Sequence, residues 1–106
     1  MEILISNKAQ ENINNITEFT LNISINYANK IINEIYNIIE SIGHSPYTGR
    51  YVPELNNKAY REKICKEYRI IYSVLEEQKI IFVKCIISGK QNSDLFFKIH
   101  KKDLFN

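Results

Sequence analysis

The sequence has few of the residues that build metal, disulfide or phosphate sites: two cysteines, two histidines and three glycines. Cys65 and Cys85 fall in separate strand-like runs without a CxxC or Cys/His spacing, which argues against a zinc site and a disulfide framework. We therefore expect two buried free thiols, no bound metal and no other cofactor. The sequence also lacks a glycine-rich loop that could hold a phosphate, because Gly89 stands alone after the last apolar run.

Long apolar runs are missing as well, and none approaches the roughly 18 residues that a membrane helix needs. Residues 1–6 lack the basic start and long apolar stretch of a signal peptide, so we expect a cytoplasmic protein. The formal net charge of +2 is too small to indicate nucleic-acid binding by the molecule as a whole, and any basic site has to be local. A length of 106 residues suits one domain over residues 1–106.

Two helices are predicted in the first half of the chain, after a short apolar strand at residues 2–6. Ser6 is a suitable N-cap for the first helix, and Ser24 for the second, which Gly43 ends before Pro46. Candidate core positions recur at helical spacing, every three or four residues, in both. They are Ala9, Ile13, Ile16 and Thr20 in the first helix, and Ala28, Ile31, Ile35, Ile38 and Ile42 in the second.

The second half of the chain changes to the alternation typical of strands, after an expected loop at residues 44–57. Residues 60–64, 68–75 and 79–87 are predicted to form an antiparallel meander. Because residues 80–83 are apolar on both faces, the sheet needs cover on both sides. The C-terminal segment with Leu95, Phe96 and Ile99 could provide the second cover. We predict an α+β fold, with an N-terminal strand and a helical hairpin packed on a small antiparallel sheet and a short C-terminal helix or tail.

One candidate site is a group of three cations on the predicted meander. If Ile64 faces Tyr68 across a three-residue connection, Lys63 lies opposite Arg69 and Arg61 points to the same face. Like charges placed opposite one another on paired strands destabilise a sheet, so the arrangement suggests a ligand. Arginine and lysine side chains bind phosphate and can stabilise charge that develops at a scissile phosphodiester.

A structural alternative explains the same cations without a ligand. The three side chains could lie on a solvated outer face with Glu62, Glu67 or Glu76 close by, and a slip of one residue in register would separate them. His44 and His100 lie far apart in the sequence and have no neighbouring nucleophile motif. His100 could act as a general acid or base only if the tail folds over the cations.

Three segments of the chain resemble the RelE/ParE family of toxins from type II toxin–antitoxin systems, whose members are often described as plasmid-stabilisation proteins. The segments are Ser45–Glu54 (SPYTGRYVPE), Tyr60–Glu62 (YRE) and Tyr68–Tyr72 (YRIIY). The resemblance implies a helical hairpin on an antiparallel sheet. It also implies an antitoxin that wraps the toxin, and growth arrest when the antitoxin is lost.

The resemblance leaves two activities open, because RelE-like members cut messenger RNA on the ribosome without a metal and ParE-like members poison DNA gyrase. Arg61, Lys63 and Arg69 match basic positions of the RelE-like endoribonucleases. In that role Lys63 and Arg61 would assist proton transfer and Arg69 would stabilise the phosphorane. Lys90 and Lys84 are the corresponding candidates for substrate binding.

The chain departs from the RNA-cleaving members at three positions. Phe97 stands where they carry a catalytic tyrosine, only Lys90 is basic where they have an arginine, and Ser88 lies where many relatives have a histidine. Three hypotheses follow: a ribosome-dependent mRNA interferase, a gyrase inhibitor without chemistry of its own, and an inactive relative that binds antitoxin. The first predicts that Arg69→Ala abolishes toxicity and leaves the fold intact.

Overall fold

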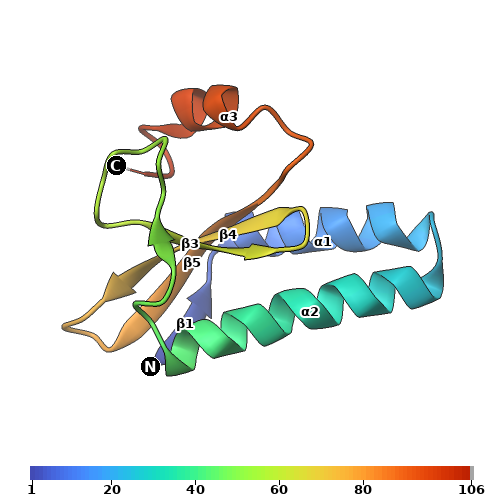
Figure 1. Cartoon of the computed structure of the whole chain (residues 1–106), viewed down its shortest axis with the longest axis horizontal. Coiled ribbons are helices and arrows are strands. Elements are labelled where there is room, and N and C mark those ends of the chain that lie inside the picture. Colours follow the sequence, from blue (N-terminus) through green and yellow to red (C-terminus); the bar gives the residue numbers. More distant parts are fainter. Residues whose placement is uncertain (106) are drawn as a thin grey trace.

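The computed structural model describes residues 1–105, which form an α+β fold with a five-stranded sheet in the order β1-β5-β4-β3-β2 (Figure 1). The helical hairpin lies on one side of the sheet and the short C-terminal helix on the other. In chain order the elements are β1 (Glu2–Ile5), α1 (Asn7–Leu21), α2 (Ile25–His44), β2 (Arg50–Tyr51), β3 (Arg61–Cys65), β4 (Tyr68–Leu75), β5 (Ile80–Ser88) and α3 (Ser93–His100).

Both long helices begin at the predicted serines. The Ser6 hydroxyl accepts a hydrogen bond from the backbone N–H of Ala9 at 2.9 Å, and the Ser24 hydroxyl accepts one from Tyr27 at 3.0 Å. Each bond satisfies one of the N–H groups that the first turn of a helix leaves free. The helix α2 ends at His44, one residue beyond the predicted end.

The predicted meander of β3, β4 and β5 is confirmed, and two further strands extend it. Residues 44–57 were expected to form only loop, but Arg50 and Tyr51 pair with Glu62 and Arg61 as the edge strand β2. At the other edge β1 pairs in parallel with β5. A parallel neighbour needs a crossover connection, which the helical hairpin and the meander provide together.

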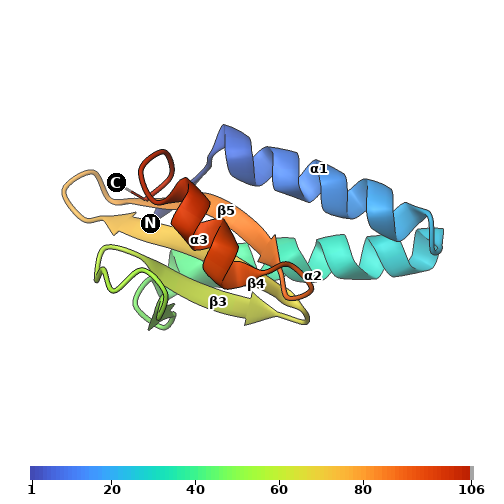
Figure 2. The same ribbon diagram turned by 90° about the horizontal axis from the view of Figure 1, so that it is seen from above.

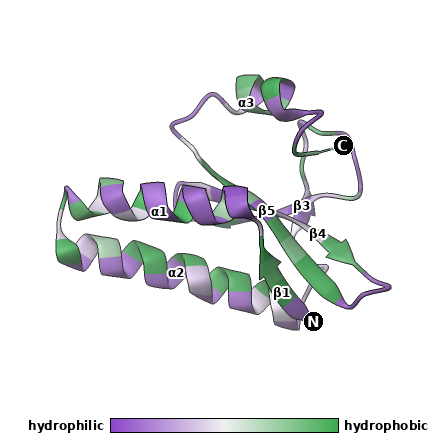
Figure 3. Ribbon diagram, turned by 180° about the vertical axis from the view of Figure 1, so that it is seen from behind, coloured by the Kyte–Doolittle hydropathy of each residue, from purple (hydrophilic) through white to green (hydrophobic). Residues whose placement is uncertain are grey.

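The sheet separates two apolar cores, as the two-sided apolar pattern of β5 predicts. Ile81 and Val83 pack against the helical hairpin, whereas Cys85 and Ile87 pack against the C-terminal segment. Figure 3 shows the hydrophobic colouring that runs along the central strands, and Figure 2 shows α3 lying over them. Both cysteines are free and buried, as predicted.

The C-terminal segment covers the sheet with partly different residues from those expected. Phe96 is buried as predicted, but its partners are Phe97 and Phe105. Leu95 and Ile99 lie on the solvent side of α3 and are 52% and 62% exposed. The helical period explains the difference, since residues four apart share a face and Phe96 and Phe97 occupy the face toward the sheet. Over residues 1–105, no helix is both long and apolar enough to cross a membrane.

Candidate functional site

The register of the β3–β4 hairpin decides where the three candidate cations lie. Only Lys66 and Glu67 form the turn, so Cys65 pairs with Tyr68 and Ile64 pairs with Arg69. The predicted three-residue connection is therefore wrong by one residue. A slip of one residue moves a side chain to the other face of a sheet.

Arg69 and Arg61 consequently point to opposite faces, and the predicted patch of three cations does not form. Arg61 and Lys63 lie opposite Tyr72 and Ile70, which belong to the core beneath the helical hairpin. Arg69 lies on the face that the C-terminal segment covers. The structure brings Arg61 and Lys63 together on one strand and separates Arg69 from both.

Arg69 is held by two glutamates. Its Nε donates to Oε1 of Glu62 at 2.8 Å, and its two terminal nitrogens donate to the two carboxylate oxygens of Glu54 at 2.6 and 2.7 Å. On the far side of Glu62, Nε of Arg50 donates to Oε2 at 2.6 Å. The Arg69 and Glu62 side chains are 12% and 0% exposed. The two arginines and two glutamates form one ion-pair network. Glu62 was expected near the cations, but on a solvated face, and the parts played by Glu54 and Arg50 were not predicted.

The hydrogen bonds of this network shift the pKa values of Arg69 and Glu54. Its hydrogen bonds with Glu54, followed by those with Glu62, raise the pKa of Arg69 above its ordinary value despite burial, which acts in the opposite direction. In return, the hydrogen bond from Arg69 lowers the pKa of Glu54. A phosphate could reach the Arg69 guanidinium only by displacing a carboxylate from a bidentate pair.

The C-terminal segment closes over the same guanidinium. The ring of Phe97 has its centroid 5.3 Å from the Arg69 Cζ atom, and Phe97 is 3% exposed. Phe105 packs on it with ring centroids 5.3 Å apart. Phe97, which the resemblance led us to match to the tyrosine of the RNA-cleaving members, is therefore part of a core. His100 lies on the same helix, where its Nδ1 is 3.1 Å from Oδ2 of Asp103.

Arg61 binds the loop that precedes β2. Its Nη1 donates to the carbonyl oxygens of Gly49 at 2.8 Å and of Tyr47 at 3.2 Å, and its Nη2 donates to the Tyr51 hydroxyl at 3.1 Å. The guanidinium also lies 4.4 Å from the centroid of the Tyr51 ring and 5.3 Å from that of Tyr47. Through these contacts Arg61 holds the loop in place. Arg61 also lines a cavity of about 370 Å³.

Tyr72 fixes the same loop from the sheet. Its hydroxyl donates to the carbonyl oxygen of Pro46 at 2.8 Å and accepts a hydrogen bond from the N–H of Gly49 at 3.1 Å. Glycine is needed there because a Cβ atom would lie 2.7 Å from the carbonyl oxygen of Glu62. The Tyr72 hydroxyl and the lack of a side chain at Gly49 together allow the loop to pack against β3.

The three candidate lysines lie apart from the arginine network. Lys63 is half-buried on β3, and Lys84 lies on β5 with its Nζ 5.0 Å from the centre of the Phe82 ring. Lys90 follows β5 and reaches to 3.8 Å from a carboxylate oxygen of Glu67. Among residues 1–105, no three histidine, cysteine, aspartate or glutamate side chains gather as metal ligands would.

Comparisons with known proteins place the chain in a family. The family described as "ParE toxin of type II toxin-antitoxin system, parDE" matches residues 3–93. The fold resembles the solved structure "Chromosomal ParDE TA system from P. aeruginosa" with a TM-score of 0.68 and 16% identity, over 83% of this chain and 95% of that one. No curated protein sequence matches the chain. Because the family match spans most of the sequence, the chain belongs to the ParE toxins of type II toxin–antitoxin systems.

Proposed function

We propose that this ParE toxin arrests growth by binding and inhibiting DNA gyrase, without catalytic chemistry of its own. The observation that carries the proposal is the state of Arg69, which is bound by Glu54 and Glu62 and covered by Phe97. Its cognate antitoxin is the regulatory partner, and gyrase is the target. Both encounters are expected in the cytoplasm.

The geometry of the cations favours gyrase inhibition over RNA cleavage. Cleavage by the neighbouring 2′-hydroxyl needs a base, an acid and a phosphate ligand around one phosphate group. Arg61 and Arg69 point to opposite faces of the sheet and cannot contact the same phosphate. Phe97 has no proton to transfer, and its ring is buried. A toxin that acts by occupying a surface of its target needs none of these groups.

Ribosome-dependent cleavage by Arg61, Lys63 and Arg69, with Lys84 and Lys90 binding substrate, remains the alternative. One variant separates the two mechanisms. Lys63→Ala removes a proposed catalytic side chain that has no ion pair among residues 1–105, so it should leave the fold unchanged. Arg69→Ala does not serve this purpose, because its loss would leave Glu62 buried beside a single cation.

The test adds the purified protein to gyrase with relaxed plasmid and, in parallel, to ribosomes programmed with messenger RNA. Gyrase inhibition predicts loss of supercoiling, intact messenger RNA, and the same inhibition by Lys63→Ala. Cleaved messenger RNA that becomes intact with Lys63→Ala would establish the ribonuclease mechanism instead. A folded protein that affects neither reaction, and does not arrest cells, would be the inactive antitoxin-binding relative.

A further inference from the structure

The strand β4 extends beyond β3 at one end of the sheet and leaves part of its edge unpaired (Figure 1). Its last pair with β3 is Tyr72 with Arg61, whereas Ser73–Leu75 pair only with β5. The chain that leads into β3 turns away here, since the N–H of Tyr60 bonds to the carbonyl oxygen of Asn57 at 3.2 Å. A sheet edge with free backbone groups can pair with another chain. We call Ser73–Leu75 the open edge.

The register of β3 and β4 places both hydrogen-bonding groups of Val74 on the open edge. In a two-residue hairpin the residues that flank the turn exchange both backbone hydrogen bonds, and the pattern repeats at every second residue. Cys65 and Tyr68 flank the turn, so Arg61 and Tyr72 form a pair of the same kind. The next residue of β4 in this series is Val74. Its N–H and C=O therefore point away from β5, and neither has a backbone partner within the part of the chain that the structure describes.

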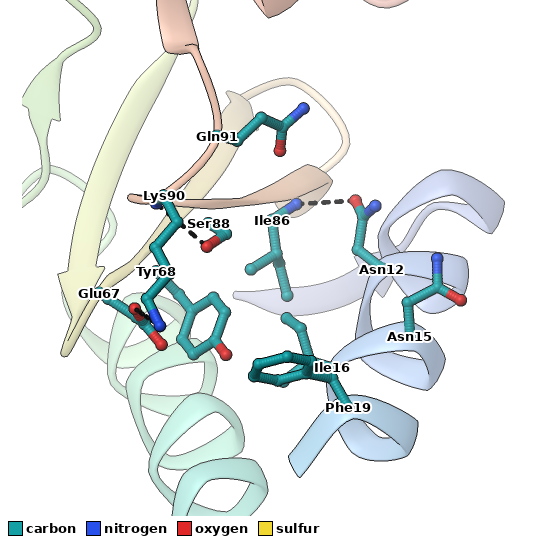
Figure 4. A pocket seen from close by; sticks show the side chains of 10 residues that line it. All are labelled: Asn12, Asn15, Ile16, Phe19, Glu67, Tyr68, Ile86, Ser88, Lys90 and Gln91. Carbon is teal, nitrogen blue, oxygen red and sulfur yellow. Dashed lines mark hydrogen bonds and ion pairs between the residues drawn. The ribbon is translucent and has the colours of Figure 1, made fainter. Parts of the chain in front are cut away.

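The overhang at the other side of the sheet shows how the fold closes such an edge. There β5 extends beyond β1, and the Ser6 hydroxyl donates to the carbonyl oxygen of Lys84 at 2.7 Å. Oδ1 of Asn12 accepts from the N–H of Ile86 at 3.0 Å, as Figure 4 shows. Side chains thus take the place of a neighbouring strand on that edge. No described side chain does the same for the open edge of β4, although backbone groups in folded proteins are generally paired.

A cavity of about 370 Å³ lies against the open edge. The open edge lines one side of it, and Ala59 and Tyr60 line the other, where the chain leads into β3. Its volume is within the range of roughly 300–1,000 Å³ that is typical of ligand pockets. The space therefore admits a few residues of a bound chain beside β4.

The cavity is also lined by two cations that no carboxylate neutralises. Lys58 and Arg61 form no ion pair with any residue from 1 to 105. Arg61 binds only two carbonyl oxygens and a hydroxyl, and its guanidinium has further N–H groups to donate. The carboxylate of Glu76 lines the cavity as well, and it accepts a hydrogen bond from the Tyr47 hydroxyl. Two positive charges against one negative charge favour a ligand with one carboxylate.

We propose that the open edge binds the C-terminal end of an extended segment of another protein, with the terminal carboxylate at Arg61. The segment adds a short antiparallel strand to β4, and its penultimate residue exchanges both backbone hydrogen bonds with Val74. Strand addition to a free sheet edge is a common mode of peptide recognition, as is capture of a terminal carboxylate. The site does not require gyrase as the target, so a failure of the gyrase proposal leaves this inference standing.

The direction of the added strand explains why a C-terminus is selected. Since β3 occupies the edge of β4 from Tyr72 onward, an added strand has to stop where β3 begins. An antiparallel strand runs in the same direction as β3 and reaches Arg61 with its C-terminus. A parallel strand would bring its N-terminal ammonium group to the same guanidinium, and like charges repel. Antiparallel pairing is also slightly more stable for each residue paired.

A peptide satisfies more of the site than a phosphate group does. A phosphate could bind Lys58 and Arg61, but its greater negative charge would meet the carboxylate of Glu76 in the same cavity. It would also leave the N–H and C=O of Val74 without partners. Only an extended backbone uses the cations and the open edge together.

The test uses a peptide of about six residues in which valine and threonine alternate, because both residues favour strands. It carries a fluorophore at its N-terminus and is prepared with a free C-terminal carboxylate and, as the matched control, with a C-terminal amide. Inorganic phosphate is the third probe. Binding to the intact toxin is measured by fluorescence anisotropy, and the site is mapped by amide chemical shifts.

The free acid is expected to bind at least about tenfold more tightly than the amide, the difference expected for one charge-assisted hydrogen bond. This preference should diminish with salt. The shifts should map to the open edge and to Arg61. Lys58→Glu should weaken binding of the free acid, whereas Lys98→Glu, which makes the same charge change on the exposed side of α3, should not.

Methylation of single peptide nitrogens tests the pairing with β4. A methyl group on the nitrogen of the penultimate residue removes the N–H that donates to Val74, so binding should weaken about tenfold. The same change at the last residue, whose N–H points away from β4, should have little effect. Equal effects of the two methylations would contradict strand pairing.

Three other results would overturn the proposal: no binding, equal binding of the acid and the amide, or shifts away from the open edge. Phosphate that binds at Arg61 more tightly than the peptide would replace the peptide site with an anion site. Sedimentation of the toxin alone should show a monomer. A dimer whose contacts map to the open edge would make a second copy of the chain the occupant instead.

Discussion

Nε of Arg69 donates to Oε1 of Glu62 across 2.8 Å, and this pair joins β4 to β3 on the face beneath α3. The Glu62 side chain is fully buried and forms ion pairs with two arginines, Arg50 and Arg69. Because both charges lose their hydration, a buried ion pair adds little net stability. Removing one partner, however, leaves the other charge buried without compensation. Arg69 is thus a structural counter-ion of the sheet.

Arg69→Ala is expected to lower the free energy of unfolding by about 3 kcal/mol, the cost typical of leaving a buried charge short of its partner. Urea denaturation followed by circular dichroism measures the loss. Arg50→Ala is the matched control because it removes the other arginine bound to Glu62, but from a side chain that is 63% exposed. Its cost should be smaller than that of Arg69→Ala, because Arg69 still donates two hydrogen bonds to Glu62 in that variant and also keeps its pair with Glu54. Equal costs for the two variants would contradict the assigned role of Arg69.

Acid should weaken the same network. The pKa of Glu54 is lowered from its ordinary value of 4.5, chiefly by the hydrogen bond from Arg69. A carboxyl with a lowered folded pKa contributes full stability above the unfolded value and loses it as pH falls through the folded value. The melting temperature should therefore decline below about pH 4.5. Glu54→Gln should be less stable at neutral pH and decline less steeply, and a parallel decline of both proteins would contradict the assignment.

Phe97→Tyr introduces the tyrosine that the resemblance to RNA-cleaving toxins leads one to expect at this position, and we expect it to confer no messenger RNA cleavage on ribosomes. The ring is 3% exposed, so the added hydroxyl would enter the core with Phe96 and Phe105. Burial of a hydroxyl without a partner costs about 1–3 kcal/mol. Leu95→Tyr, on the exposed side of α3, is the control and should change neither stability nor activity. Ribosome-dependent cutting by the Phe97→Tyr protein would show that the tyrosine alone was missing.

Tyr72→Phe is expected to cost about 1–3 kcal/mol, because it leaves the buried N–H of Gly49 without its acceptor. The loop before β2 should become mobile as well, and hydrogen exchange at Gly49 should quicken. Tyr47→Phe provides the comparison, since its hydroxyl bonds to Glu76 at the surface. If both variants had equal stability and equal exchange rates, Tyr72 would not be what holds the loop.

The reactivity of the two cysteines tests whether the cores on the two faces of the sheet stay packed, since Cys65 lies in the core beneath the helical hairpin and Cys85 in the core beneath α3. Burial raises the pKa of Cys85 to about 12, and burial also raises the pKa of Cys65. Since the thiolate is the reactive form, neither residue should react with a disulfide reagent at pH near 8 until the protein unfolds. Absorbance of the released thiol in native buffer and in denaturant measures both rates. Rapid reaction of Cys85 in native buffer would mean that α3 does not stay closed over β5.

The two long helices and the three strands of the meander follow from local signals in the sequence, whereas the edge strand β2 and the pairing of β1 with β5 do not. Ser6 and Ser24 are polar residues placed just before apolar positions of helical period, and both cap helices as expected. The alternation in residues 68–75 likewise predicts β4 to the residue. Such signals depend on neighbours in the chain, and a sequence contains those neighbours directly.

The candidate site was harder to predict because it depends on register. The turn between β3 and β4 has Lys66 at a positive φ of 56°, a conformation usually taken by glycine, asparagine or aspartate. Without one of those residues, the sequence gives no sign that the turn has two residues instead of three. That single residue decides whether Arg69 joins Arg61 or Glu62. The burial of Phe97 and Phe105 also depends on packing between distant segments.

The parallel pairing of β1 with β5 has a consequence for synthesis of the toxin. Ser6, directly after β1, donates its hydroxyl to the carbonyl oxygen of Lys84, and the two residues are 78 positions apart. Contacts between distant residues form late, whereas the helical hairpin involves only close neighbours. During translation β5 emerges after the other four strands, so α1 and α2 emerge long before the sheet that they cover is complete. The helical hairpin therefore stays without its sheet until the ribosome has made residues 80–88.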